Sequence, residues 1–195
     1  AKTTGSSTNF SFTRAMQTSV GTDDAIVGDI VNDDNAELFL KISQNSSEIN
    51  TEIYFSEYGT DNLDPGYDAQ SFSTLDTYIS TRLIETIEST DGVDFGIQSL
   101  SFENMLGKTI PLSVNALSGI EATISISHNT TYASTYVYLE DALEGTFTNL
   151  KETNFVITPD SDLQGAGRFF IHTSSTTMSN EDESTNLLNV FKLQN

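Results

Sequence analysis

The sequence predicts an all-β protein, an antiparallel β-sandwich of the jelly-roll kind, and three observations support this fold class. Apolar and polar residues alternate with a period of two in many short segments, which turns one face of each segment toward a core. Clusters of Gly, Asn, Asp and Ser separate these segments, as turns do between strands. Helical spacing is confined to one ambiguous stretch. Short strands at such intervals over a chain of 195 residues are typical of sandwiches and jelly rolls.

The expected strands follow one another along most of the chain. In order, they cover residues 9–13, 37–43, 51–55, 95–100, 109–114, 122–127, 136–140, 154–158 and 168–172. In the second of these, Leu38, Leu40 and Ile42 share one face. Polar residues bound each strand, and we therefore expect exposed loops at both ends of the sheets.

Residues 73–89 are the ambiguous stretch. Leu75, Ile79, Leu83 and Ile87 are spaced as on one face of a helix. The stretch also contains several threonines, which are poor helix formers. We therefore expect a strand over residues 78–86 rather than a helix.

Composition limits the classes of function. The chain carries 28 acidic and 8 basic residues, a net charge of −20, so we expect neither nucleic acid nor an anionic membrane surface as a partner. It contains no Cys, which removes disulfides, thiolate metal ligands and a thiol nucleophile. No apolar run reaches the ~20 residues that a membrane span needs, and we expect no membrane insertion and no signal peptide.

The expected domain organisation is one folded module over residues 8–173. Residues 174–195 are expected to form a flexible linker and the start of a truncated following element. Residues 173–185 consist almost entirely of Ser, Thr, Asn and acidic residues, and an apolar pattern resumes at Leu187. We therefore interpret the chain as a piece of a longer secreted protein.

An acidic cluster around a Pro-Gly turn is the candidate metal site. Pro65 and Gly66 suit the two central positions of a type II turn, because proline fixes φ and glycine tolerates a positive φ. Such a turn can direct Asp61, Asp64 and Asp68 toward one Ca²⁺ ion, although their spacing is not that of an EF-hand. The alternative is that these carboxylates cap the turn by accepting hydrogen bonds from nearby N–H groups.

Exposed aromatic rings are the candidate ligand-binding groups for a sugar. The chain has no Trp, so its seven tyrosines carry this prediction. The candidates are Tyr132, which lies in an expected loop, together with Tyr67 and Tyr58. Tyr136 and Tyr138 share one strand face, which would form a stacking platform if it were exposed. We favour the alternative that these two rings fill the core.

No motif indicates catalysis. The HExxH and GxSxG patterns are absent, and neither His128 nor His172 has further donors at the spacing of a usual zinc site. We expect structural roles for both histidines. A Ser-His-Asp triad or a pair of glycosidase carboxylates stays open, because serines and acids are numerous, but nothing in the pattern supports either. We therefore predict that the module is not an enzyme.

Six phrases occur in order in the second two-thirds of the chain: DPGYDA (64–69), GIQSL (96–100), IPLSV (110–114), VYLED (137–141), FTNL (147–150) and GRFFIH (167–172). EIYF (52–55) precedes them. With this series the chain resembles a region of large secreted proteins of Bacteroidetes, where it precedes the C-terminal sorting domain of the type IX secretion system.

The resemblance implies export across the outer membrane and display at, or release from, the cell surface. Proteins that carry this region include adhesins and polysaccharide-degrading enzymes, and the region itself has no known catalytic residues to transfer. Within it we expect Arg168 to pair with Asp141 or Glu140, a structural role.

The sequence therefore favours a non-catalytic extracellular module that serves cell-surface adhesion or carbohydrate binding. The expected partner is a polysaccharide or a cell-surface glycan, Ca²⁺ is the candidate cofactor, and the isolated module is expected to be a monomer. The alternative is a structural spacer or stalk without a ligand of its own. A spacer should bury its tyrosines and lack a concave site.

Overall fold

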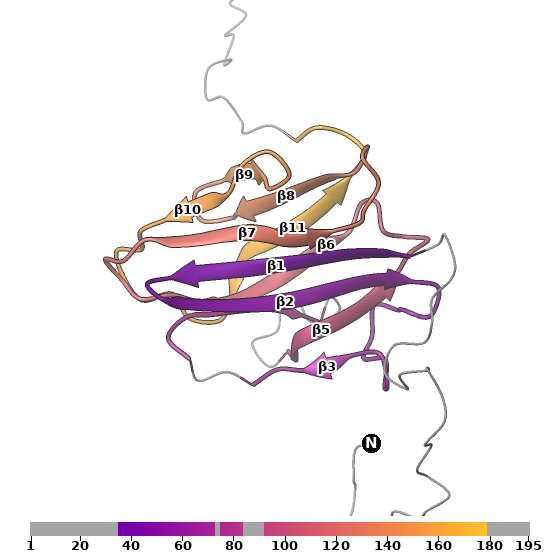
Figure 1. Cartoon of the computed structure of the whole chain (residues 1–195), viewed down its shortest axis with the longest axis horizontal. Coiled ribbons are helices and arrows are strands. Elements are labelled where there is room, and N and C mark those ends of the chain that lie inside the picture. Colours follow the sequence, from indigo (N-terminus) through magenta and orange to yellow (C-terminus); the bar gives the residue numbers. More distant parts are fainter. Residues whose placement is uncertain (1–34, 73–74, 84–91, 179–195) are drawn as a thin grey trace, which may run out of the picture.

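The computed structural model describes residues 35–72, 75–83 and 92–178, and within them the protein consists of strands and loops without a helix (Figure 1). The strands are β1 (Ala36–Gln44), β2 (Ser47–Ser56), β3 (Ala69–Gln70), β4 (Tyr78–Arg82), β5 (Asp94–Ser101), β6 (Thr109–Asn115), β7 (Ala122–Asn129), β8 (Tyr136–Asp141), β9 (Thr146–Asn149), β10 (Phe155–Ile157) and β11 (Ala166–Ser174). The all-β prediction is confirmed.

The strands form one hydrogen-bonded sheet in the order β10-β7-β1-β2-β5-β4-β6-β11-β8-β9, and β3 pairs with β5 outside this path. Among the strand pairs of the described residues, only β2 and β5 are parallel, from Glu52↔Ile97 to Ser56↔Ser101. The expectation of a wholly antiparallel sheet is corrected at this pair. Two parallel strands cannot be joined by a tight turn, and the chain between them includes β3 and β4.

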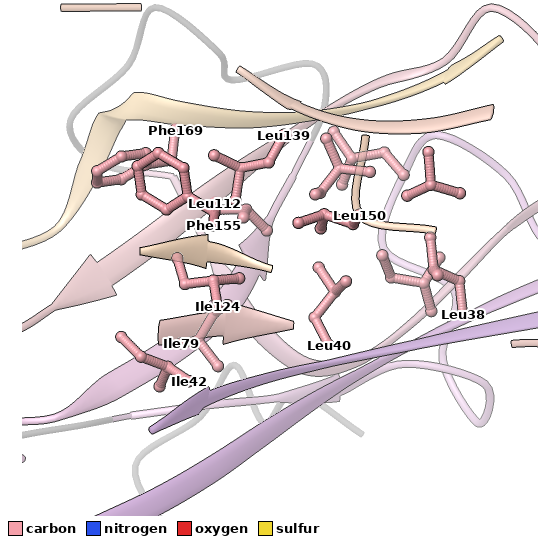
Figure 2. Packing of buried hydrophobic residues seen from close by; sticks show 14 of the residues in the cluster. Leu38, Leu40, Ile42, Ile79, Leu112, Ile124, Leu139, Leu150, Phe155 and Phe169 are labelled. Atoms are coloured by element: carbon pink, nitrogen blue, oxygen red, sulfur yellow. The ribbon is translucent and has the colours of Figure 1, made fainter. Parts of the chain in front are cut away.

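The sheet curls back on itself and is nearly closed, so that its two halves enclose one core. Leu38, Leu40 and Ile42 of β1 are fully buried and face Leu139 and Phe169 of the opposite half (Figure 2). Burying one such side chain contributes about 1.5–3 kcal/mol. A slip of β1 by one residue would move its whole apolar face into solvent, so the period-two pattern fixes the register.

The β1–β2 hairpin shows how local sequence sets this register. The two strands pair from Ala36↔Phe55 to Gln44↔Ser47, which leaves a turn of two residues. Asn45 occupies the turn with a φ of 54°, a left-handed conformation that asparagine tolerates better than most residues. The polar stretch that separates the two expected strands is therefore mostly paired strand rather than loop.

The other expected strands are found close to their predicted ranges. The expected strand at 78–86 is found over Tyr78–Arg82, as favoured over a helix. Residues 84–86 and the expected strand at residues 9–13 lie outside the described residues. β3 and β9 were not predicted. The last strand ends at Ser174, next to the predicted module boundary, whereas residues 1–34 and 179–195 lie outside the described residues.

The described residues contain no helix of the length and apolar character that a membrane crossing requires.

Candidate functional site

One end of the fold collects the candidate residues. The parallel strands β2 and β5 both end there, with Ser56↔Ser101 as their last pair. β7 also ends there, beside the start of β1. The loops at this end, to the right in Figure 1, cover residues 57–68, 102–108 and 130–135. They carry four aromatic rings, and we call their surface the aromatic end: Tyr58, Tyr67, Phe102 and Tyr132.

The predicted Pro-Gly turn is present in the first of these loops. The Tyr67 N–H donates to the Asp64 carbonyl at 3.1 Å, and the Asp68 N–H donates to the same oxygen at 3.0 Å. Gly66 has a φ of 97°, which a type II turn requires at this position and which disfavours any side chain. The turn reverses the chain and places Tyr67 on the surface.

The Asp64 and Asp68 carboxylates are used inside the loop. Asp64 accepts hydrogen bonds from the Thr60 N–H at 2.6 Å and from the Thr60 hydroxyl at 2.9 Å. Asp68 accepts from the Asp64 N–H and from the Ser99 N–H, both at 2.7 Å, and so ties the turn to β5. Burial raises the pKa of the Asp68 carboxyl, although these two N–H donors act in the opposite direction.

Asp61 pairs with the Lys108 ammonium, and this ion pair joins the first loop to the second. Within residues 35–72, 75–83 and 92–178, no group of three or more His, Cys, Asp or Glu is placed to hold a metal ion. The arrangement favours the turn-capping alternative for Asp64 and Asp68, since their oxygens already accept hydrogen bonds. Calcium binding stays a prediction.

Tyr58 and Tyr67 come together as a ring pair on this surface. Their ring centroids are 5.9 Å apart with an interplanar angle of 17°, a stacked arrangement, and their exposed fractions are 56% and 47%. The Glu57 carboxylate bonds to the Tyr58 hydroxyl and raises its pKa. Gly59, which follows, is buried against β5, where a Cβ would lie 2.7 Å from the backbone nitrogen of Leu100. Glycine therefore lets the loop reach the sheet.

Tyr132 lies in the third loop and is 54% exposed, as predicted for a loop ring. Its ring meets the edge of Phe102 at a centroid distance of 6.0 Å, and Phe102 packs against the core. The Phe102 N–H donates to the Ser56 carbonyl at 3.0 Å, so the same residue borders the loop that carries Tyr58. Phe102 thereby connects the first and third loops.

Lys151 holds the third loop through two backbone carbonyls. Its ammonium donates to the backbone carbonyls of Tyr132 at 2.8 Å and of Thr135 at 2.7 Å. Burial lowers the pKa of Lys151. Sequence reasoning did not identify Lys151, Phe102 or Gly59 as contributors, because no local motif distinguishes a lysine or a phenylalanine that supports a distant loop.

Two further tyrosines lie on β8. Tyr136 and Tyr138 stack on one another with centroids 5.8 Å apart, on the face of β8 opposite to its core residues Val137 and Leu139. The favoured prediction that both rings are buried is met in part, because Tyr138 is 6% exposed whereas Tyr136 is half-buried. The pair does not form an open stacking platform.

Both histidines pair with a glutamate on a neighbouring strand. His128 Nε2 lies 2.8 Å from Glu37 Oε2, and His172 Nε2 lies 2.6 Å from Glu140 Oε2. The Thr109 hydroxyl lies 3.1 Å from His172 Nδ1, which completes a hydroxyl–imidazole–carboxylate row across β6, β11 and β8. Such a row has the order of a catalytic triad.

The residues of the row on β6, β11 and β8 line neither of two clefts on the surface of the described residues. One cleft of about 270 Å³ is lined by residues 75–76, 115–117 and 162–164, and one of about 530 Å³ is lined by residues of 141–146, 155–161 and Arg168. A substrate therefore has no enclosed position beside Thr109 in either cleft. The three tyrosines of the aromatic end line neither of these clefts.

The expected ion pair of Arg168 is found. Its Nε and NH2 groups donate to the two oxygens of Asp141 at 2.8 and 2.7 Å, a bidentate geometry, and the Asp141 side chain is 2% exposed. This pair lies on the wall of the larger cleft, at the end of β8 remote from the aromatic end.

Comparison of the chain with protein-family models, with curated proteins and with solved structures finds no match. The resemblance to the Bacteroidetes region therefore stays a prediction.

Proposed function

We propose that the chain is a non-catalytic glycan-binding module of a larger protein that is exported by type IX secretion and works at the outer cell surface. The observation that carries the proposal is the position of Tyr58, Tyr67 and Tyr132. All three rings are about half exposed and lie at one end of the fold on loops anchored to the sheet. For the fold we keep the proposal of a sandwich of the jelly-roll kind.

The way in which neighbouring rings hold these tyrosines in place supports glycan binding. Tyrosine offers a rigid apolar face with a polar tip, and a ring that is already ordered loses little conformational entropy when a sugar stacks on it. Tyr132 rests on Phe102, and Tyr58 stacks on Tyr67, so both ring surfaces are preformed. Loops on a stable sheet are the usual place for such contacts.

Charge selects the class of glycan. The chain has a net charge of −20, and Glu57, Asp61, Asp64, Asp68 and Glu103 lie on the loops of the aromatic end. An anionic polysaccharide would be repelled there, whereas a neutral one would not. We therefore propose a neutral polysaccharide or cell-surface glycan as the ligand of the monomeric module.

The second candidate function is that of a spacer without a ligand. A spacer gains nothing from exposed rings, and the exposure of Tyr58, Tyr67 and Tyr132 therefore favours binding. Two clefts on the surface also depart from the smooth surface expected of a spacer. Affinity electrophoresis through gels that contain neutral algal and plant polysaccharides separates the two functions. Retardation on at least one of them supports binding, and none on any of them supports the spacer.

Calcium enters the proposal as a candidate cofactor of the first loop. Thermal unfolding with EDTA and with added Ca²⁺ tests it, because an ion that binds the folded state raises the melting temperature. Equal melting temperatures under both conditions would remove calcium from the account.

A further inference from the structure

The nearly closed sheet has a seam between its two terminal strands. β9 pairs with β8 and β10 pairs with β7, and within the described residues no ladder joins β9 to β10. A short turn over residues 150–154 connects β9 to β10. In it the Glu152 and Thr153 N–H groups donate to the Asn149 carbonyl at 3.0 Å. From this turn the two strands diverge, and the sheet stays open between them (Figure 1).

The larger cleft lies at the open side of this seam. Its volume is about 530 Å³, within the roughly 300–1,000 Å³ that ligand sites occupy. The β8–β9 turn forms one wall, and β10 with the residues that follow it forms the other. Leu143 on the first wall is 70% exposed, and Val156 on the second is 51% exposed. Both walls therefore present apolar side chains to solvent.

The charge of the cleft is acidic. Three acids and one base line it, which gives 1 − 3 = −2, and the acids are Asp141, Glu144 and Asp160. Arg168 is committed to the buried Asp141 by two hydrogen bonds. Glu144 reaches Arg168 only at 3.9 Å and its side chain is 63% exposed, so negative charge is available to a ligand.

We propose that the seam binds an extended polypeptide segment of a partner, which pairs with the open edge of β10 as an added strand. Edge strands present backbone N–H and C=O groups, and strand addition is a common mode of peptide recognition. Phe155 is buried and Val156 is exposed. In the added strand, the side chains beside Phe155 therefore face the core, and those beside Val156 face solvent. Basic side chains of the segment meet Glu144 and Asp160.

The test uses the protein over its full length and a short synthetic peptide of alternating valine and threonine between terminal lysines. Its backbone N-methylated form is the first control, because it keeps the side chains and loses the donors. Backbone amide NMR of the protein is the readout. The expected result is a change at residues 155–161 and 143–146, with new slow exchange of β10 amides and binding about tenfold weaker for the N-methylated peptide.

Protein variants give the second control. Glu144→Lys should weaken binding of the lysine-flanked peptide about tenfold, and Glu103→Lys, an exposed acid at the aromatic end, should leave it unchanged. Equal binding of both peptide forms would overturn strand addition. Amide changes confined to the aromatic end, or none at millimolar peptide, would also overturn the proposal.

A second copy of this chain is the rival occupant. Sedimentation at increasing protein concentration detects it, and dimers that disappear in Val156→Asn would replace the partner peptide by self-association. The cleft of the seam lies beside Asp141, at the end of β8 remote from the aromatic end, so a failure of glycan binding does not decide this test.

Discussion

The Lys151 ammonium donates to the backbone carbonyl of Tyr132 at 2.8 Å and so holds the loop that carries this candidate ring. The same ammonium binds the Thr135 carbonyl, and together the two contacts close the loop from beneath. A lysine outside the proposed ligand surface thus positions a tyrosine within it.

Replacing Lys151 tests this positioning. Lys151→Met keeps the length of the side chain and removes both hydrogen bonds, so we expect a loss of about 1–3 kcal/mol in the free energy of unfolding. Urea unfolding measures it. Lys41→Met is the matched control, because Lys41 pairs with Glu48 in solvent and should cost at most about 1 kcal/mol. Equal losses for the two variants would contradict a special role of Lys151.

Gly59 is predicted to be intolerant of a side chain. In Gly59→Ala the added Cβ would lie 2.7 Å from the Leu100 backbone nitrogen, and backbone cannot move aside easily. We expect a loss of about 1–3 kcal/mol and a displaced Tyr58. Gly96→Ala is the control, because its Cβ would meet only Ser71 at 3.7 Å, an ordinary contact. Thermal unfolding and near-ultraviolet circular dichroism give the readouts, and an unshifted melting temperature of Gly59→Ala would refute the close approach.

Removing one partner of the Arg168–Asp141 ion pair should lower the free energy of unfolding. Arg168→Met leaves the Asp141 carboxylate buried without its partner, and we expect a loss of about 3 kcal/mol. Adding Asp141→Asn should recover part of this loss, because the unpaired buried charge is then removed. Urea unfolding of the two variants measures both effects. If the double variant has a lower free energy of unfolding than Arg168→Met, the loss in Arg168→Met does not come from an unpaired buried charge.

Asp68 predicts a pH dependence with a definite sign. Burial raises the pKa of this carboxyl in the folded state above the usual value of 3.8, so the folded protein binds the proton more tightly than the unfolded chain does. This contribution to stability is fully present below pH 3.8 and is lost as the pH rises through the raised pKa. Unfolding free energies of the protein and of Asp68→Asn, compared across this range, should shift in favour of the variant as the pH rises. The opposite slope would mean that the Asp64 and Ser99 N–H donors outweigh burial.

Period-two alternation was enough to locate most strands, because one buried face leaves a mark on the sequence of each. β1 is the clearest example, since Leu38, Leu40 and Ile42 alternate with half-buried residues. β9 was missed because all four of its residues are half-buried and carry no alternation. The parallel pairing of β2 with β5 depends on which distant strands meet, a property that no local pattern records.

The site was predictable in part for the same reason. The expected loop around Tyr132 was enough to predict that its ring is exposed, and the residue types of Pro65 and Gly66 were enough to predict the turn. The stacking of Tyr58 on Tyr67 depends on how one loop folds, and the support from Lys151 joins two different loops, so no local pattern of residues records either contact. The use of Asp64 and Asp68 as acceptors of N–H groups was one of two open alternatives, and only the three-dimensional arrangement favours it.

Glycan binding by the aromatic end is tested by affinity electrophoresis, in a gel that contains a neutral polysaccharide, of a variant that lacks the three exposed rings. Each tyrosine that stacks on a sugar should contribute about 0.5–1.5 kcal/mol, so single Tyr58→Ala, Tyr67→Ala and Tyr132→Ala changes should weaken binding about two- to tenfold. We predict that the triple variant moves as in a gel without polysaccharide, while Phe72→Ala, an exposed ring beside the opposite end of β5, keeps full retardation. Retardation of the triple variant equal to that of the unchanged protein would show that these three rings do not bind the glycan.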